Sequence, residues 1–275
     1  MTSEEKKHLE DAACDIRILT IDAIGNLGVG HIGGAMSIVE VLTVLYMKHL
    51  RHDPKQPRWD GRDRLVLSKG HAGPALYSTL AYRGFFPKDM LYTLNRGGTN
   101  LPSHCDRNRT PGIDMTTGSL GQGLSAASGI ALALRMNKNT AKVYAIIGDG
   151  ESNEGQVWEA AMFAAQQKLD SLIAFTDYNK MQIDGMTHEI NDLGDIEGKW
   201  KSFGWHVLRV NGHDVEAIDN AITEAKQHTG KPTMIILDTI KGKGASFCEG
   251  SLGSHNMTFD AAKAAEAIAK LKEAR

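Results

Sequence analysis

Short runs of apolar residues alternate along the chain with longer segments in which apolar residues recur at helical spacing. Short apolar runs bounded by turn residues are typical of buried strands, and apolar positions three and four residues apart are typical of helices. The predicted strands are 65–67, 143–147, 172–175, 206–210 and 234–237, and the helices between them are 72–83, 121–136, 154–168 and 214–228. We therefore expect an α/β, doubly wound fold, with a mostly parallel sheet and helices on both faces.

Two further segments with helical spacing, 4–25 and 37–50, precede the first predicted strand, and a glycine-rich stretch, 28–34, separates them. Because glycines interrupt helices, we expect residues 28–34 to form a loop between two helices. Residues 260–275 are rich in Ala and Lys and predict a closing amphipathic helix. No repeat or linker divides the chain, so we expect residues 1–275 to form a single domain.

Composition narrows the functional classes. With 275 residues, of which 41% are hydrophobic, the chain can bury a large core. Its 31 basic and 33 acidic residues include no run that would bind a phosphodiester backbone or a lipid surface, so we expect neither nucleic acid nor membrane partners. The N-terminal segment is polar, no apolar stretch could span a bilayer, and three widely spaced cysteines are typical of reduced thiols. We therefore expect a cytoplasmic protein.

Polar residues follow two consecutive predicted strands, at the edge where parallel sheets bind ligands. Residues 148–150, Gly-Asp-Gly, follow the first of these strands, and Asn179 and Met181 follow the second. The Asp149 carboxylate, the Asn179 amide oxygen and a nearby backbone carbonyl form a set of hard oxygen donors that suits Mg²⁺ or Ca²⁺. Three protein oxygens leave room for phosphate oxygens, and the next helix directs its N-terminus to the same place. The pattern predicts a metal-bound diphosphate.

Gly-Asp-Gly followed about thirty residues later by Asn resembles the signature of thiamine-diphosphate-binding proteins. Further motifs occur in the order found in transketolases, and the resemblance covers nearly the whole chain. These motifs are Gly30-His31-Ile32-Gly33, Arg62-Asp63-Arg64, Leu67-Ser68-Lys69-Gly70-His71, Thr117-Gly118-Ser119-Leu120-Gly121-Gln122-Gly123 and Gly204-Trp205-His206. The chain thus resembles the diphosphate-binding (PP) domain of transketolase.

The resemblance implies residues for holding thiamine diphosphate. Asp149, Asn179 and the carbonyl of Met181 resemble the family's Mg²⁺ ligands, and Ca²⁺ or Mn²⁺ can take the place of Mg²⁺. Gly150 would touch the diphosphate, and Ile183 would lie near the cofactor rings.

A second segment, Gly118, Ser119 and Leu120, resembles the one whose backbone meets the aminopyrimidine ring, with the Leu120 side chain supporting the bent cofactor. Glu154 resembles a family glutamate at the contact between subunits, which helps to link the two active sites. A glutamate in the first turn of a helix is also explained by the helix dipole alone.

Four histidines, His31, His71, His104 and His255, match family positions that line the cofactor and the substrate channel. Neutral imidazole can accept a hydroxyl proton near pH 7 and later return it, as cleavage of a carbon–carbon bond beside an alcohol requires. The resemblance implies that His31 and His255 transfer protons at the C3 hydroxyl of the donor. It implies that His71 and His104 hold the C1 hydroxyl or the diphosphate, with His71 and His255 also contacting the cofactor.

The sequence departs from the family pattern at Ile32, where Pro is frequent, and at Asn256, where Ser-His-Gly is common. Residues 241–244, Lys-Gly-Lys-Gly, follow a predicted strand and are compatible both with a phosphate contact and with a solvated turn.

In the family, a pyrimidine-binding domain supplies the glutamate that activates the cofactor, and a third domain follows. The sequence ends at Arg275 before either, so we expect them on a separate chain. The resemblance implies the N-terminal subunit of a split transketolase, inactive alone and active in an α2β2 heterotetramer with a C-terminal transketolase subunit. The implied reaction is attack of the cofactor carbanion on a ketose or ketose phosphate and transfer of a two-carbon ketol unit to an aldose or aldose phosphate.

Other interpretations stay open from the sequence. Deoxyxylulose-phosphate synthase and the α subunit of 2-oxo acid dehydrogenases share Gly-Asp-Gly and Asn, although the four histidines disfavour the dehydrogenase. A regulatory subunit that binds a diphosphate without turnover is a different class of function. A transketolase for a sulfonated or branched sugar is a further alternative.

Overall fold

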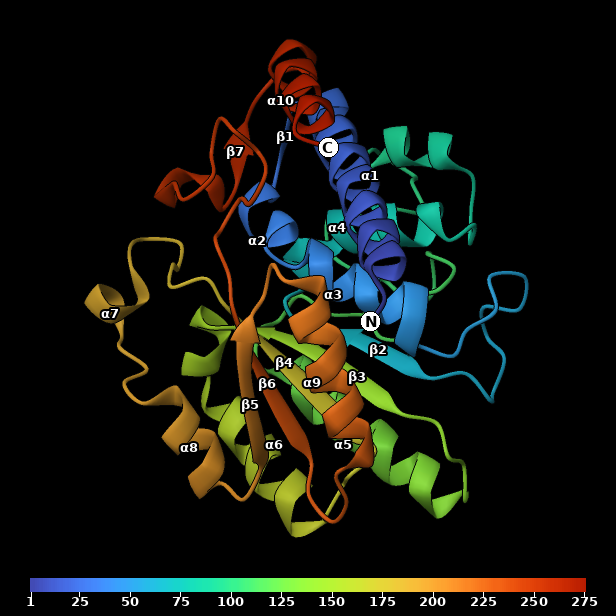
Figure 1. The fold of residues 1–275 in the computed structure, drawn as a ribbon, viewed down its shortest axis with the longest axis vertical. Helices are drawn as coiled ribbons and strands as arrows, with labels where there is room; N and C mark the ends of the chain where they lie inside the picture. Colours follow the sequence, from blue (N-terminus) through green and yellow to red (C-terminus); the bar gives the residue numbers. More distant parts are fainter.

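A five-stranded parallel sheet forms the centre of the molecule, and the computed structural model describes all residues from 1 to 275. The strand order is β2-β3-β4-β6-β5, and every neighbouring pair is parallel. The strands are β2 (Arg64–Leu67), β3 (Val143–Gly148), β4 (Leu172–Tyr178), β5 (His206–Asn211) and β6 (Thr233–Asp238). Their carboxyl ends lie at the middle of the molecule (Figure 1).

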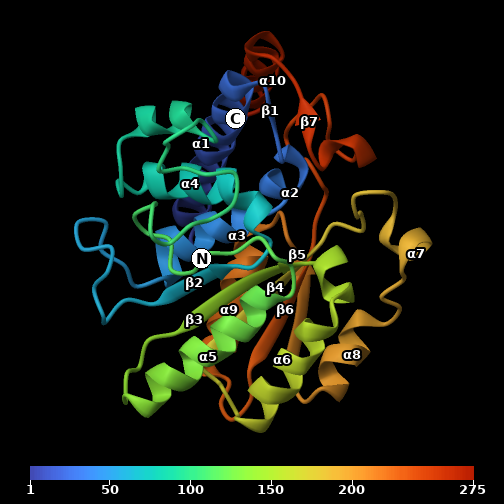
Figure 2. The ribbon, with the colours of Figure 1, turned by 180° about the vertical axis from the view of Figure 1, so that it is seen from behind.

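Helices cover both faces of this sheet, as predicted (Figures 1 and 2). One face carries α3 (Val39–Val44), α4 (Gly73–Tyr82) and α9 (Val215–Gln227), with α1 (Ser3–Leu27) packed over α3 and α4. The other face carries α5 (Gln122–Met136), α6 (Gly155–Gln166) and α8 (Ile196–Ser202). The remaining helices are α2 (Ile32–Met36), α7 (Thr187–Ile190) and α10 (Ala261–Glu273). None of the helices combines the length and apolar character that a membrane span requires.

Alternation of side chains along the strands divides the core into two clusters. Tyr144 and Ile146 of β3 pack into the cluster beneath α3, α4 and α9, whereas Ala145 and Ile147 pack into the cluster beneath α5, α6 and α8. A strand buried on both faces needs apolar residues at nearly every position, which explains the uninterrupted apolar run of β3. The predicted α/β, doubly wound architecture is confirmed.

The structure corrects the prediction for residues 206–210. They form β5 as expected, but no residue of this strand is fully buried. The reason is the strand order, because β6 lies between β4 and β5 and leaves β5 at the edge with a single neighbour. Arg209 of β5 pairs with Asp238 of β6 across this exposed edge.

The glycine-rich stretch 28–34 is not the simple loop that was expected. It contains strand β1 (Val29–Gly30) and the first residues of α2, and residues 37–50, expected as one helix, divide into α3 and a π-helical turn, Leu45–His49. β1 pairs antiparallel with β7 (Met257–Thr258), which the sequence did not predict because the two partners are far apart along the chain. The pairing brings the C-terminal segment beside α2.

Candidate functional site

A pocket of about 410 Å³ lies at the carboxyl edge of the parallel sheet. Segments that follow β2, β3, β4 and β6 form part of its wall, which is where open α/β sheets bind ligands. Every residue predicted for the site lines the pocket except Ser119, which directly precedes Leu120. The predicted residues in the wall are His31, His71, His104, Gly118, Leu120, Asp149, Gly150, Glu154, Asn179, Met181, Ile183 and His255.

Asp149 and Asn179 meet at this edge because β3 and β4 are paired with Gly148 opposite Asp177. The Asp149 side chain is almost fully buried, with 2% of its surface exposed, and its carboxylate accepts hydrogen bonds from the backbone N–H groups of Gly150 and Lys180. Burial, together with the neighbouring Asp177 carboxylate, raises the pKa of Asp149 to about 7. A cation bound beside Asp149 would favour its ionised form.

The donor set fits a divalent cation held jointly with a ligand. No group of three or more His, Cys, Asp or Glu side chains is arranged to hold a metal ion. The carboxylate of Asp149, the amide oxygen of Asn179 and the carbonyl of Met181 are hard oxygens, which Mg²⁺ prefers, and they leave positions for diphosphate oxygens and water. The residues present therefore fit a Mg²⁺ ion that bridges the chain to a diphosphate.

The fully buried carboxylate of Asp177 lies behind these ligands and organises them. It accepts hydrogen bonds from Lys69 Nζ at 2.5 Å, Ser37 Oγ at 2.6 Å and Asn179 Nδ2 at 2.9 Å, and another from the Thr239 hydroxyl. Burial alone would raise the pKa of Asp177, but the Lys69 ammonium and these donors outweigh it and lower the pKa. The charge of Asp177 is thus neutralised by Lys69, whereas that of Asp149 is not.

Glu151 connects two walls of the pocket. Its carboxylate accepts hydrogen bonds from the N–H of Gly121 at 2.8 Å, from the N–H of Gly148 at 3.0 Å and from the Ser68 hydroxyl. These contacts fasten the segment that contains Gly118 to the end of β3.

The four predicted histidines form one cluster around His31. The ring centroid of His31 lies 5.4 Å from that of His71, 5.6 Å from that of His104 and 5.4 Å from that of His255. The rings of His71 and His255 are 5.0 Å apart. His31 reaches the cluster from the start of α2, and His255 reaches it through the pairing of β1 with β7.

All four imidazoles have lowered pKa values, chiefly because burial disfavours the charged form. Burial and the charge of Lys69 lower the pKa of His71 to about 2, and burial and the charge of Lys241 lower the pKa of His255 to about 4. Burial also lowers the pKa of His31 and of His104. The cluster is therefore neutral at pH 7, and its nitrogens can accept hydrogen bonds from hydroxyl groups.

The sequence did not single out three charged residues of the pocket wall, Lys69, Glu151 and Asp184. Lys69 stands within the motif of residues 67–71, and Glu151 directly follows Gly-Asp-Gly. Closeness to these motifs along the chain was the one sign in the sequence that the two residues belong to the site. Lys241 also lines the pocket and is only 2% exposed, which favours a ligand contact over a solvated turn.

The chain is similar to known proteins over nearly its whole length. Residues 9–274 match the family model described as transketolase, thiamine diphosphate binding domain. A 6-deoxy-6-sulfo-D-fructose transketolase subunit of Clostridium sp. (strain MSTE9) is 59% identical over 98% of both chains. An apulose-4-phosphate transketolase subunit of Phocaeicola vulgatus is 41% identical over 89% of this chain and 86% of its own length.

Solved transketolases share the fold. The enzyme from Leishmania mexicana superposes with a TM-score of 0.90 at 32% identity, over 96% of this chain and 41% of that one. The enzyme from Campylobacter jejuni superposes with a TM-score of 0.87 at 32% identity, over 97% of this chain and 48% of that one. The chain thus spans less than half the length of these two solved transketolases. It belongs to the family of transketolase thiamine-diphosphate-binding domains.

Proposed function

We propose that this chain is the cofactor-binding subunit of a two-chain transketolase, which transfers a two-carbon ketol unit from a ketose to an aldose. One observation carries the proposal: the oxygen donors Asp149 and Asn179 and the cluster of neutral histidines around His31 face the same pocket. The two oxygen donors suit a metal-bound diphosphate, and the neutral histidines suit a polyhydroxylated substrate. Their combination in one pocket is what ketol transfer needs.

The pocket would hold thiamine diphosphate through Mg²⁺ on Asp149, Asn179 and the Met181 carbonyl, with Gly150 and Lys241 beside the diphosphate. Lys241 suits this role because burial lowers its pKa only to about 8, so it is still largely protonated at pH 7. When bound, thiamine diphosphate supplies the electron sink for breaking a carbon–carbon bond next to a carbonyl.

The rings of that cofactor would lie against Gly118, Ser119, Leu120 and Ile183. Gly118, Leu120 and Ile183 all line the pocket, and the Ile183 side chain is exposed enough to meet a ligand. The Glu151 carboxylate holds the segment that contains Gly118 and Leu120 in place through the N–H of Gly121.

The histidine cluster would handle the hydroxyl groups of the sugar. His31 and His255 would accept and return the proton of the donor's C3 hydroxyl, and His71 and His104 would hold the C1 hydroxyl or the diphosphate. The anionic charge of a bound diphosphate favours protonated imidazole, so it would raise the lowered pKa of His255 toward the range that proton transfer requires.

A second chain would complete the site. The Clostridium relative is named as one subunit of a transketolase, and this chain matches 98% of its length, whereas it matches 42% of the transketolase-like protein 2 of Bos taurus. Glu154 is exposed at the pocket and occupies the N-cap position of α6 without a capping hydrogen bond, so its side chain is available for a contact with the partner. We place two copies of each chain in an α2β2 heterotetramer, in the cytoplasm, where the free thiols of Cys14, Cys105 and Cys248 stay reduced.

The donor sugar would carry an anionic group. The relative named for 6-deoxy-6-sulfo-D-fructose is 59% identical, compared with 41% for the one named for apulose 4-phosphate. This difference favours a sulfonated ketose as donor, with ketose phosphates as the alternative.

Co-expression of the chain with the product of the neighbouring gene tests the proposal. The purified complex, with thiamine diphosphate and Mg²⁺, is assayed for ketol transfer from 6-deoxy-6-sulfofructose, fructose 6-phosphate and xylulose 5-phosphate to an aldose acceptor. We expect transfer from at least one donor by the complex and none by either chain alone. Full activity of the isolated chain would overturn the two-chain proposal.

Substitution of Asp149 tests the metal assignment. Asp149→Ala is expected to abolish transfer by the complex and its binding of Mg²⁺ with thiamine diphosphate. The matched control is Asp192→Ala, which removes an exposed carboxylate outside the pocket and is expected to leave transfer unchanged. Transfer that survives Asp149→Ala rules out this carboxylate as a metal ligand.

A further inference from the structure

The turn that follows β6 carries Lys241 into the pocket. The Lys241 ammonium donates hydrogen bonds to the carbonyl of Gln182 at 3.0 Å and to the carbonyl of Met181 at 3.5 Å. Met181 and Gln182 belong to the loop after β4 that would supply a carbonyl to the metal. The position of Lys241 therefore affects both the diphosphate side and the metal side of the pocket.

Four contacts from other segments hold the backbone around Lys241, and one of them is made at Lys241 itself, where its carbonyl accepts from the Gly250 N–H at 2.8 Å. The N–H of Ile240 donates to Nε2 of His213 at 2.8 Å, and the N–H of Gly242 donates to the Gly33 carbonyl at 2.9 Å. Arg17 Nε donates to the carbonyl of Lys243 at 2.8 Å. Two of the four anchors are thus side chains from distant segments, α1 and the turn after β5.

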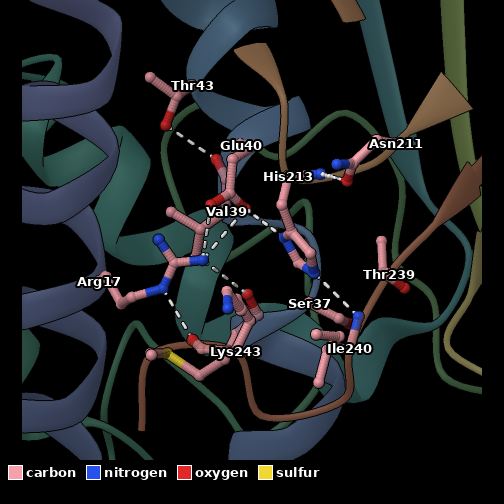
Figure 3. Close-up of polar contacts among 12 residues, drawn as sticks. Arg17, Ser37, Val39, Glu40, Thr43, Asn211, His213, Thr239, Ile240 and Lys243 are labelled. Atoms are coloured by element: carbon pink, nitrogen blue, oxygen red, sulfur yellow. Dashed lines mark hydrogen bonds and ion pairs between the residues drawn. The ribbon is translucent and has the colours of Figure 1, made fainter. Parts of the chain in front are cut away.

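Glu40 of α3 joins these two side chains (Figure 3). Arg17 Nη2 donates to both oxygens of the Glu40 carboxylate, at 2.8 and 3.0 Å, and His213 Nδ1 lies 3.1 Å from Oε2. Because His213 Nε2 accepts the Ile240 N–H, the ring proton lies on Nδ1 and is donated to Glu40. A continuous chain of contacts thus runs from Lys243 through Arg17, Glu40 and His213 to Ile240.

The network is buried and charged. Arg17 and Glu40 are 6% and 7% exposed, and although burial alone raises the pKa of Glu40, Arg17 and His213 outweigh it and lower the pKa to about 2. The gain in stability from a buried ion pair is small, since desolvation offsets the attraction, but its directional contacts fix the positions of the groups it joins. Gly244 allows Arg17 to lie against the turn, because a Cβ there would lie 2.8 Å from Nε of Arg17.

We propose that Arg17, Glu40 and His213 form a positioning network that holds residues 240–243 and thereby aims Lys241 at the pocket. No member of the network lines the pocket itself, so its effect on a ligand passes through Lys241. The inference rests on the proposed function, in that the ligand is thiamine diphosphate with Mg²⁺.

A double-mutant cycle tests whether His213 acts through Lys241. In the complex with its partner chain, His213→Ala is expected to weaken thiamine diphosphate binding in the presence of Mg²⁺ by roughly 10-fold, the size typical for removal of a supporting residue. In a Lys241→Ala background the same substitution should change the affinity by no more than about twofold. Equal losses in both backgrounds would show that His213 acts on binding without Lys241 and would overturn the proposal.

Two further variants separate positioning from general stability. In His213→Gln the side-chain oxygen can take the place of Nε2 and accept the Ile240 N–H, so most of the affinity should return. His49→Ala removes a histidine of similar burial, with 7% of its side chain exposed compared with 11% for His213, that pairs with Asp219 at 2.7 Å away from the pocket. This substitution should lower stability without changing the affinity. If His49→Ala lowers cofactor affinity as much as His213→Ala does, the proposal is wrong.

Hydrogen–deuterium exchange in the isolated chain gives a readout that needs no ligand. His213→Ala should accelerate exchange of the amides of residues 240–245 by at least about 10-fold, since the anchor of Ile240 is lost, and His49→Ala should not. Unchanged exchange in this segment overturns the network even if the cofactor binds. Failure of the wild-type complex to bind thiamine diphosphate, with accelerated exchange in His213→Ala, would instead overturn the proposed function alone.

Discussion

The side-chain amide of Asn179 donates a hydrogen bond of 2.9 Å to the buried carboxylate of Asp177. An amide group has one donor end and one acceptor end, and at the acceptor end Oδ1 accepts from the Met181 N–H at 3.1 Å. Both contacts assign the same orientation, which leaves the second lone pair of Oδ1 for a cation. Asp177 and the Met181 N–H together determine which end of Asn179 a metal ion would meet, although Asp177 itself does not line the pocket.

Asp177→Asn is expected to weaken Mg²⁺ binding by about 10- to 100-fold, the range typical of residues that orient metal ligands. The neutral amide no longer favours the donor end of Asn179, so the Met181 N–H alone orients that side chain, and the charge of Lys69 is left unpaired. Calorimetric titration of Mg²⁺ into the complex with saturating thiamine diphosphate measures the effect.

Asp219→Asn is the matched control for that substitution. Asp219 is a buried carboxylate that pairs with Lys48 and His49, away from the pocket, so its loss should reduce stability without affecting Mg²⁺. A folded Asp177→Asn complex with wild-type affinity for Mg²⁺ would contradict the role given to Asp177.

Glu151→Gln is expected to reduce both stability and cofactor affinity. One carboxylate oxygen becomes an NH₂ group, which cannot accept from the N–H of Gly121 or Gly148, and an unsatisfied buried donor costs about 1–3 kcal/mol. Urea unfolding of the isolated chain measures the first effect and thiamine diphosphate titration of the complex the second. An unchanged unfolding midpoint would show that these contacts contribute nothing.

Acid should destabilise the isolated chain through its histidine cluster. The folded-state pKa values of His71 and His255, about 2 and about 4, lie below the value of about 6.5 for an unfolded histidine. Between these values the unfolded state binds more protons, so the contribution of His255 is complete above pH 6.5 and is lost as the pH falls toward 4. Urea midpoints measured from pH 4.5 to 8 should decrease on the acid side.

His255→Gln provides the comparison for this pH dependence. Without the imidazole, the decrease below pH 6.5 should be shallower, whereas above pH 7 the two curves should run parallel. Identical slopes in the two proteins across the acid range would mean that His255 protonates as easily in the folded state as in the unfolded one.

The sequence predicted the metal side of the pocket because the relevant geometry is local. An apolar run that ends in Gly-Asp-Gly and a second run that ends before Asn179 place both groups at one edge of any parallel sheet. The sequence could not predict that β6 would insert beside β4, so the exposure of β5 was missed.

The sequence also could not predict the contacts that support the site, because they join segments that are far apart along the chain. Glu40 meets His213, and Ser37 meets Asp177, across long separations along the chain. Neither pair has a spacing that a pattern of residues can reveal, since Ser37 lies at the end of α2 and Glu40 lies in α3, and both contacts depend on where these helices meet the ends of β4 and β5. The four histidines were found through their motifs, whereas their arrangement around His31 depends on the unpredicted pairing of β1 with β7.

Two glycines of α5 provide a final test of how closely the pocket wall is packed. A Cβ at Gly129 would meet nothing within 4 Å, so Gly129→Ala should stabilise the chain by about 0.5–1 kcal/mol through helix propensity. A Cβ at Gly123 would lie 2.6 Å from Cα of Ser68, so Gly123→Ala should cost about 1–3 kcal/mol. The same change should weaken thiamine diphosphate binding, because Ser68 and Gly121 share the Glu151 carboxylate. Urea unfolding and cofactor titration of both variants measure these effects, and equal behaviour of the two would show that α5 can move away from Ser68 without disturbing the site.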